Sequence, residues 1–438
     1  MKKSIVVLLM ILLGMGGGLL HAQKGKQGND TPKTELRFLV KDASDSIVYL
    51  AVHFRDKLIL KDSVAPATPG KYVFTPATPY QEGLYMLVGQ NKRPYLNFII
   101  EKNQSFSITC DTSGDVRNVI IVNSPENVEV LKFQQKSVES QKKAIELRNN
   151  RAEAKKKGNE ELAANYAKQM EDLNKEMEAF IEELIVANPD YLFSKMQRAY
   201  KAIQVPDPPK KEDGTIDSNF QAIYYRTHYW DHIDLGDGRL LYTPVLEPKI
   251  NDYFTKVLYY QEADTIAKYV DMVLDRAAKD SVAYRFFLEW LSYKFESSKV
   301  IGHDAVFVHI VKNNQMQNKC TWMDEDLVRK YEKRVKNLEP ILIGKTAVEM
   351  IIPDTAQSDD FNRWYSSYSL TKPYVIIWFY DPDCPTCTKE SAKLKILYDS
   401  LETAGIRNFD VYGIAADKDI DRWKKYLKEK KFPWINVG

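Results

Sequence analysis

The spacing of hydrophobic residues changes twice along this chain, and each change predicts a different kind of structure. From about residue 35 to residue 122, short runs of β-branched and aromatic residues alternate with turn residues such as those of segment 65–70. Runs of this kind favour strands, and short strands at this spacing indicate an antiparallel sandwich or barrel. Strands are expected at 36–40, 47–52, 71–74, 84–88 and 96–100.

The second pattern is helical and begins near Asn127. Segments 128–156 and 160–186 are rich in Lys, Glu and Gln with apolar residues at helical spacing, and Lys157-Gly158-Asn159 separates them. We expect two long solvated helices packed as a hairpin, with an extended coiled coil as the alternative. Segment 220–338 continues with aromatic-rich helical patterns and is expected to form a spacer or docking platform.

Beyond Gly344 the third pattern alternates strands with helices. Strands that alternate with helices form right-handed crossovers, so the first two strands should pair in parallel. The three patterns together predict a multidomain α+β protein with domains at 35–123, 124–343 and 344–438. In the last domain, strands are expected at 374–380, at 409–415 and from Trp434, and helices at 388–402 and 419–430.

The N-terminus has the pattern of an export signal. Lys2 and Lys3 precede an apolar run from residue 5 to residue 20, and Leu20-His21-Ala22 fits a cleavage site before Gln23. We expect a signal peptide at 1–22, then a linker at 23–34; an uncleaved membrane anchor is the alternative. The expected location is the periplasm or cell envelope.

Composition narrows the function. Lys and Arg number 62 against 60 Asp and Glu, a net charge of +2, which argues against binding nucleic acid. Four cysteines are too few for a disulfide scaffold in an exported chain of this length. Cys110 and Cys320 are expected to be buried free thiols, although a bridge between them is possible outside the cytoplasm.

The other two cysteines form a C-x-x-C motif, Cys384-Pro385-Thr386-Cys387, between an expected strand and an expected helix. A helix N-terminus stabilises a thiolate at Cys384, and Cys387 would lie one turn further on. A zinc site would need further ligands, and haem attachment would need a histidine where Thr388 stands. A structural disulfide is the remaining alternative. His228 and His232 share helical spacing, but packing or capping is expected there, so no metal site is predicted.

These residues resemble the thioredoxin superfamily, specifically its exported TlpA/ResA-like branch. The resemblance lies in the strand ending Ile376-Ile377-Trp378-Phe379-Tyr380, in the C-x-x-C motif and in the following Thr388-Lys389-Glu390. Upstream, the chain is similar to an architecture with an N-terminal β domain and a helical domain of unknown function. The expected fold is therefore a β-sandwich-like domain, a helical domain and an incomplete thioredoxin-like α/β domain.

The resemblance implies a thiol–disulfide oxidoreductase without a bound cofactor, in which Cys384 attacks and Cys387 resolves the mixed disulfide. Glu390 would lie beside the cysteines and tune their pKa or move a proton, unless it is only a surface glutamate. The implied partners are cysteine-containing envelope proteins as substrates and a membrane thiol reductant, with cytochrome c biogenesis or envelope thiol homeostasis as the setting. A homodimer is possible. A non-catalytic binding or scaffold protein is the competing class.

The sequence departs from the family in three places. Asp383 precedes Cys384, and together with Asp381 it should disfavour the thiolate, which favours a reductase. Trp378 stands where some thioredoxins carry an acid, so a buried proton acceptor would come from elsewhere. Pro433 does not fit the cis-proline loop beside the disulfide. The chain is thus expected to lack about 50–70 residues of this domain and to be inactive in this form.

Overall fold

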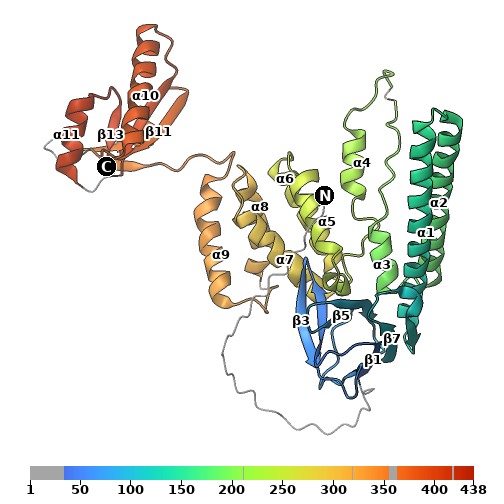
Figure 1. Cartoon of the computed structure of the whole chain (residues 1–438). Helices are drawn as coiled ribbons and strands as arrows, with labels where there is room; N and C mark the ends of the chain where they lie inside the picture. Colours follow the sequence, from blue (N-terminus) through green and yellow to red (C-terminus); the bar gives the residue numbers. More distant parts are fainter. Residues whose placement is uncertain (1–33, 211, 318, 355–362, 417–418) are drawn as a thin grey trace. The chain divides into compact units, whose positions relative to one another are not determined.

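A computed structural model describes residues 34–210, 212–317, 319–354, 363–416 and 419–438 (Figure 1). The expected signal peptide and nearly all of the linker lie outside these residues. The chain divides into two compact units, Met1–Tyr259 with Arg276–Ala283 and Tyr260–Asp275 with Tyr284–Gly438. The described residues form a mixed α+β protein with sheets and 11 α-helices, as the α+β prediction requires. No helix among them has the length and apolar character needed to cross a membrane.

The first unit begins with two four-stranded sheets, ordered β4-β1-β7-β8 and β3-β2-β5-β6. Both sheets contribute alternate residues to one hydrophobic core, which includes Phe38 of β1, Leu50 of β2 and Phe98 of β6. The strands are β1 (Glu35–Lys41), β2 (Val48–Phe54), β3 (Lys57–Val64), β4 (Lys71–Phe74), β5 (Gly83–Gly89), β6 (Pro94–Ile100), β7 (Ser105–Asp111) and β8 (Ile120–Val122).

One strand pair corrects the expectation of a purely antiparallel sheet. β1 pairs with β7 in parallel over its whole length, with Phe38 opposite Ile108. Parallel neighbours need a crossover connection rather than a hairpin, and here the chain passes through the second sheet between β1 and β7. The sequence pattern did not predict β3, because charged residues interrupt its apolar ones and most of its side chains are exposed.

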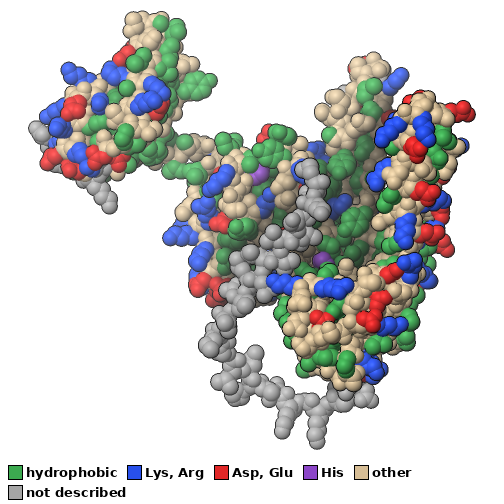
Figure 2. All heavy atoms as spheres, viewed as in Figure 1, with side chains coloured by type: hydrophobic (Ala, Val, Ile, Leu, Met, Phe, Trp, Pro, Cys, Tyr) green, Lys and Arg blue, Asp and Glu red, His purple; other side chains and the backbone are tan. Residues whose placement is uncertain are grey.

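Two long helices follow, α1 (Pro125–Lys156) and α2 (Glu160–Ala187). They pack as a hairpin, with Lys136 Nζ on α1 2.5 Å from Glu176 Oε1 on α2. Gly158 turns the chain at a left-handed φ of 70°, and the Asn159 side chain caps α2 by accepting from the Leu162 amide. Figure 2 shows Lys, Arg, Asp and Glu side chains mixed along this hairpin, as expected for solvated helices.

The first turn of α1 is fixed to the sheet by polar contacts. Asn127 accepts from the Ile99 amide at 2.7 Å and donates to the Ile99 carbonyl at 2.6 Å, so it pairs with β6 as a neighbouring strand would. Glu126, only 3 % exposed, accepts from the backbone amide of Phe193 at 2.8 Å. That amide belongs to the first turn of α3 (Leu192–Ala199), so the Glu126 carboxylate caps a helix from another segment.

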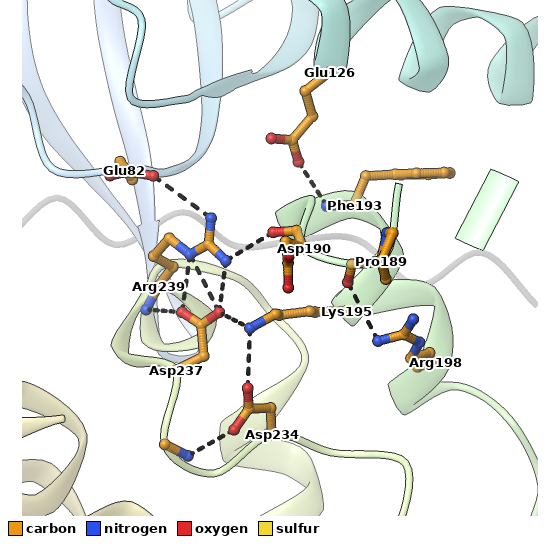
Figure 3. A network of polar contacts seen from close by, with 11 residues as sticks. Glu82, Glu126, Pro189, Asp190, Phe193, Lys195, Arg198, Asp234, Asp237 and Arg239 are labelled. Carbon is orange, nitrogen blue, oxygen red and sulfur yellow. Dashed lines mark hydrogen bonds and ion pairs between the residues drawn. The ribbon is translucent and has the colours of Figure 1, made fainter. Parts of the chain in front are cut away.

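Figure 3 shows the polar network around this cap. Arg239 donates to Asp237 at 2.7 Å and to the Asp190 carbonyl at 3.0 Å, and it lies 3.6 Å from Glu82 beside β5. Lys195 on α3 contacts Asp237 at 2.6 Å. Burial raises the pKa of Glu126 to about 7, although the Phe193 amide opposes the shift. A buried acid with an unusual pKa therefore joins the sheets, α1 and α3.

Further helices continue in both units: α4 (Phe220–His228), α5 (Leu246–Asp252), α6 (Ala263–Ala277), α7 (Ser281–Glu296), α8 (His303–Asn313) and α9 (Glu325–Leu338). In the first unit, Trp230 and Tyr253 are almost fully buried, with ring centroids 5.1 Å apart. In the second unit, the Phe307 ring of α8 meets Tyr331 of α9 edge to face at 5.3 Å. Aromatic packing thus organises these helices.

The C-terminal segment forms a three-stranded sheet, ordered β11 (Tyr374–Tyr380), β12 (Phe409–Ala415) and β13 (Ile435–Val437). Both pairs are parallel, which confirms the predicted pairing of the first two strands. Apolar side chains of α10 (Pro385–Thr403) pack on one face, together with Val411 and Trp434. On the other face, β9 (Ile351–Pro353) and β10 (Trp364–Ser366) contribute Ile352 and Tyr365 to the core. The helix α11 (Ile420–Lys430) precedes β13.

Candidate active site

The turn between β11 and α10 carries the C-x-x-C motif. β11 ends at Tyr380, which is buried, and α10 begins at Pro385 with Cys384 as its N-cap. Asp381 folds the turn: its carboxylate accepts from the Asp383 amide at 2.8 Å and its carbonyl from the Cys384 amide at 3.1 Å. Proline suits the first helical position, where no intrahelical N–H bond is needed. Short-range sequence signals therefore place Cys384 at a helix N-terminus.

Cys384 has the environment of a nucleophile. The residue is partly exposed, and its sulfur accepts a hydrogen bond from the Cys387 amide at 3.1 Å. The pKa of Cys384 lies below its ordinary value, first because of the Cys387 thiol and then because of the Cys387 and Thr386 amides. The predicted effect of Asp381 is confirmed in direction, because its charge raises the pKa of Cys384. The hydrogen bonds at the helix N-terminus outweigh it, so the pKa is lowered on balance.

Cys387 differs from its neighbour. Its pKa lies above the ordinary value, mainly because of its hydrogen bond with Cys384. Its side chain packs at the edge of an aromatic cluster that contains Tyr380, Trp423 and Tyr426. The pair thus combines one thiol that favours the thiolate with one that favours the protonated form, as a nucleophile and a resolving thiol require.

Glu390 lies one helical turn beyond Cys387. Its carboxylate binds Lys393 at 2.7 Å, and its side chain is 43 % exposed. The hydrogen bond with Lys393 lowers the pKa of Glu390. A role beside the cysteines remains a prediction, because this carboxylate pairs with the surface lysine Lys393.

Beneath the turn, buried polar side chains form a continuous chain. Trp423 of α11 donates to the Tyr380 hydroxyl at 2.8 Å, and this hydroxyl donates to Asn436 of β13 at 3.1 Å. Burial raises the pKa of Tyr380, and the nearby Asp354 carboxylate acts in the same direction. Asp354, 3 % exposed, follows β9. A buried carboxylate therefore acts on Tyr380 from the segment after β9, to which the sequence pattern did not point.

The sequence also gave no sign of the contacts from α11. Arg422 forms an ion pair with Asp383, 39 residues earlier in the chain. The Tyr426 hydroxyl lies 3.3 Å from the Thr388 hydroxyl of α10. The predicted crossover topology would bring this helix near the turn, but no local motif marks the residues that meet.

The remaining candidates lie elsewhere. Cys110 and Cys320 are free and buried, as expected. His228 binds Asp231 at 2.6 Å and stacks on Tyr224. Within the part of the chain that the structure describes, no three His, Cys, Asp or Glu side chains are grouped to hold a metal ion. The peptide bond before Pro433 is trans, like the others in these residues.

A family described as a domain of unknown function, DUF5106, matches residues 148–338, less than half of the chain. No match was found among curated proteins. Among solved structures, a thioredoxin-like protein from Bacteroides caccae is 19 % identical, with a TM-score of 0.39 and coverage of 54 % of this chain and 83 % of the other.

Two further structures share 26 % identity and a TM-score of 0.18. The thioredoxin domain of a thiol–disulfide oxidoreductase from Bacteroides vulgatus is matched over 22 % of this chain and 61 % of its own. A thiol:disulfide interchange protein from Bacteroides sp. is matched over 21 % of this chain and 55 % of its own. The chain thus spans less than two thirds of these two proteins. These solved structures are thioredoxin-like or thiol–disulfide exchange proteins. The chemistry available to Cys384 in this chain follows from the geometry of its own turn.

Proposed function

We propose that this protein is a thiol–disulfide oxidoreductase whose active pair is Cys384 and Cys387. The observation that carries the proposal is the position of Cys384: a partly exposed residue at the N-cap of α10, whose sulfur accepts a hydrogen bond from the Cys387 amide at 3.1 Å. Amide donors and the helix dipole stabilise the thiolate, which is the reactive form of the thiol.

The reaction is disulfide exchange. The Cys384 thiolate attacks one sulfur of a partner disulfide, forms a mixed disulfide and releases the other partner sulfur as a thiolate. Cys387, once deprotonated, attacks the Cys384 sulfur and releases the second partner thiolate. The partner gains two electrons, and the pair becomes a disulfide. The chemistry needs no bound cofactor.

The direction and setting are part of the proposal. We infer a reductase of the cell envelope that acts on cysteine-containing envelope proteins and is regenerated by a membrane thiol reductant. The expected export signal supports this setting. Support for a reducing direction from Asp383 is weakened, because Arg422 pairs with that carboxylate. The reduction potential therefore becomes the deciding quantity.

The test is the equilibrium reduction potential of the pair, measured by thiol labelling of the full chain across a dithiothreitol or glutathione series. A potential near or below about −200 mV supports a reductase, whereas a value near about −120 mV indicates an oxidase or isomerase. A pair that does not cycle at all contradicts the enzyme proposal and favours the scaffold alternative.

A second experiment isolates the attacking sulfur. Cys387→Ser removes the resolving thiol, so the mixed disulfide between Cys384 and a disulfide-containing peptide should accumulate. Cys384→Ser is the matched control and should trap far less peptide. Equal trapping by both variants would mean that the assigned roles of the two cysteines are wrong.

A further inference from the structure

The residue directly before the nucleophile is held by a helix from a later part of the chain. Arg422 Nη1 donates to the Asp383 carboxylate, next to Cys384. The Arg422 side chain is 43 % exposed and that of Asp383 62 % exposed, so solvent weakens the attraction between their charges although the two groups are in contact. The pair brings a positive charge to the turn that carries the reactive sulfur.

Arg422 is placed there by buried neighbours. It lies in the first turn of α11, where the Asp419 side chain accepts from its amide at 3.1 Å. The next residue, Trp423, is buried and donates to the Tyr380 hydroxyl at the end of β11. One turn later, the Tyr426 hydroxyl lies 3.3 Å from Thr388 on α10. α11 therefore contacts the end of β11, the turn and α10 at three successive points.

The charged and titratable groups around Cys384 come from three places. Asp381 and Asp383 lie on the turn, Cys387 lies on α10, and Arg422 lies on α11. Asp381 acts against the thiolate. Asp383 is two residues closer to α10, and without a partner its carboxylate would act in the same direction and oppose the dipole of α10. The Arg422 guanidinium offsets that charge.

We propose that Arg422 is a positioning residue for Cys384, which neutralises Asp383 and fixes the turn so that the nucleophile stays reactive near neutral pH. The proposal rests on the proposed function only in taking Cys384 as the attacking thiol. It predicts a change in the titration of one sulfur, which is measurable without any turnover.

The experiment follows the alkylation of Cys384 by neutral iodoacetamide as a function of pH, with each cysteine quantified by peptide mass spectrometry on the full chain. Arg422→Gln should move the midpoint to higher pH and slow labelling at pH 7 by about two- to fivefold, the range of an exposed ion pair. Asp383→Asn should not slow labelling at pH 7. Added salt should shrink the difference between Arg422→Gln and the unaltered chain.

The double variant Asp383→Asn with Arg422→Gln supplies the decisive comparison. Once the carboxylate is gone, loss of Arg422 should have little further effect on the midpoint. Lys428→Gln removes the same charge from an exposed position two turns along α11 and should leave the midpoint unchanged. A purely structural role of Arg422 would change the limiting rate at high pH or the melting temperature without moving the midpoint.

The proposal is overturned if Arg422→Gln leaves the midpoint in place, or if its shift is equally large in the Asp383→Asn background. These outcomes are separate from failure of the proposed function. A pair that does not cycle in the redox titration contradicts the oxidoreductase assignment, whereas the titration of Cys384 tests Arg422 alone.

Discussion

Cysteine and glutamate have opposite pKa shifts in two regions of the molecule, the core of the N-terminal segment and the first turns of α10 with its N-cap. Cys110 lies in β7 at 3 % exposure, and burial raises the pKa of its thiol to about 11. Cys384, at a helix N-terminus, has a pKa below its ordinary value. Hydrogen-bond donors at a partly exposed position stabilise the anion, whereas a sheet interior offers none and disfavours the charge.

The carboxylates repeat the contrast. Glu126 is buried where α1 meets the sheets, beside Glu82 and Glu101, and its pKa rises to about 7. Glu390 lies on the surface of α10, and Lys393 lowers its pKa. The surroundings of each side chain, rather than its residue type, thus set the direction of its pKa shift. This contrast can be tested in four ways.

The largest effect is expected from removing the reactive sulfur. Cys384→Ser should reduce disulfide exchange with a labelled disulfide peptide to the uncatalysed background, because a hydroxyl is not a nucleophile in this reaction. Cys110→Ser is the matched control: it should preserve exchange and cost about 1–3 kcal/mol of stability by burying a hydroxyl. Equal loss of exchange in both variants would mean that folding, and not chemistry, had been disturbed.

The next effect is the selectivity of labelling. At pH 7 a thiol with a pKa of about 11 is roughly one ten-thousandth thiolate, whereas a pKa below 9 leaves more than about one hundredth. Iodoacetamide should therefore modify Cys384 at least about a hundredfold faster than Cys110 or Cys320. Labelling of all three cysteines at equal rates in the native protein would contradict the difference in pKa between Cys384 and the two buried thiols. In urea, where the fold is lost, the three rates should converge.

A smaller effect is expected at Glu126. Its folded pKa of about 7 lies above the usual value of an unfolded glutamate, so the folded state binds more protons between about pH 4.5 and pH 7. The stability that the proton supplies is complete below that window and is lost as the pH rises through it, by up to about 3 kcal/mol. Glu126→Gln should remove this pH dependence and retain the acceptor for the Phe193 amide.

Hydrogen exchange of the first turns of α1 and α3 measures this locally. In the unaltered chain, protection of these amides, corrected for the intrinsic pH dependence of exchange, should fall between pH 5 and pH 8, whereas in Glu126→Gln it should stay constant. Glu129→Gln, on the next turn of α1, is the control and should behave like the unaltered chain. If the corrected pH profile of Glu126→Gln is the same as that of the unaltered chain, a group other than Glu126 causes the pH dependence.

The sequence pattern was sufficient for elements whose signals are local. Short-range causes explain three of these elements: the alternation of β11 and β12 with helices, the start of α10 at Pro385, and the break at Lys157-Gly158-Asn159. The pattern failed where distant segments meet. Three contacts join residues that lie 39 or more positions apart: the parallel pairing of β1 with β7, the burial of Glu126 under α3, and the ion pair of Arg422 with Asp383.

The smallest effect is expected at Glu390, and it tests whether the family's glutamate acts here. Its carboxylate is exposed and bound to Lys393, so Glu390→Gln should change the rate of Cys384 alkylation at pH 7 by less than about twofold. Lys393→Gln, which releases the carboxylate, is the informative partner variant. If Glu390 is only a surface residue, both variants should leave the pH profile of Cys384 alkylation unchanged. If Glu390 belongs to the active site, Lys393→Gln should shift the midpoint of that profile, and the shift should disappear when Glu390→Gln is added to it. That outcome would narrow the contrast between the two glutamates, because Glu390 would then act on the sulfur whenever its lysine is displaced.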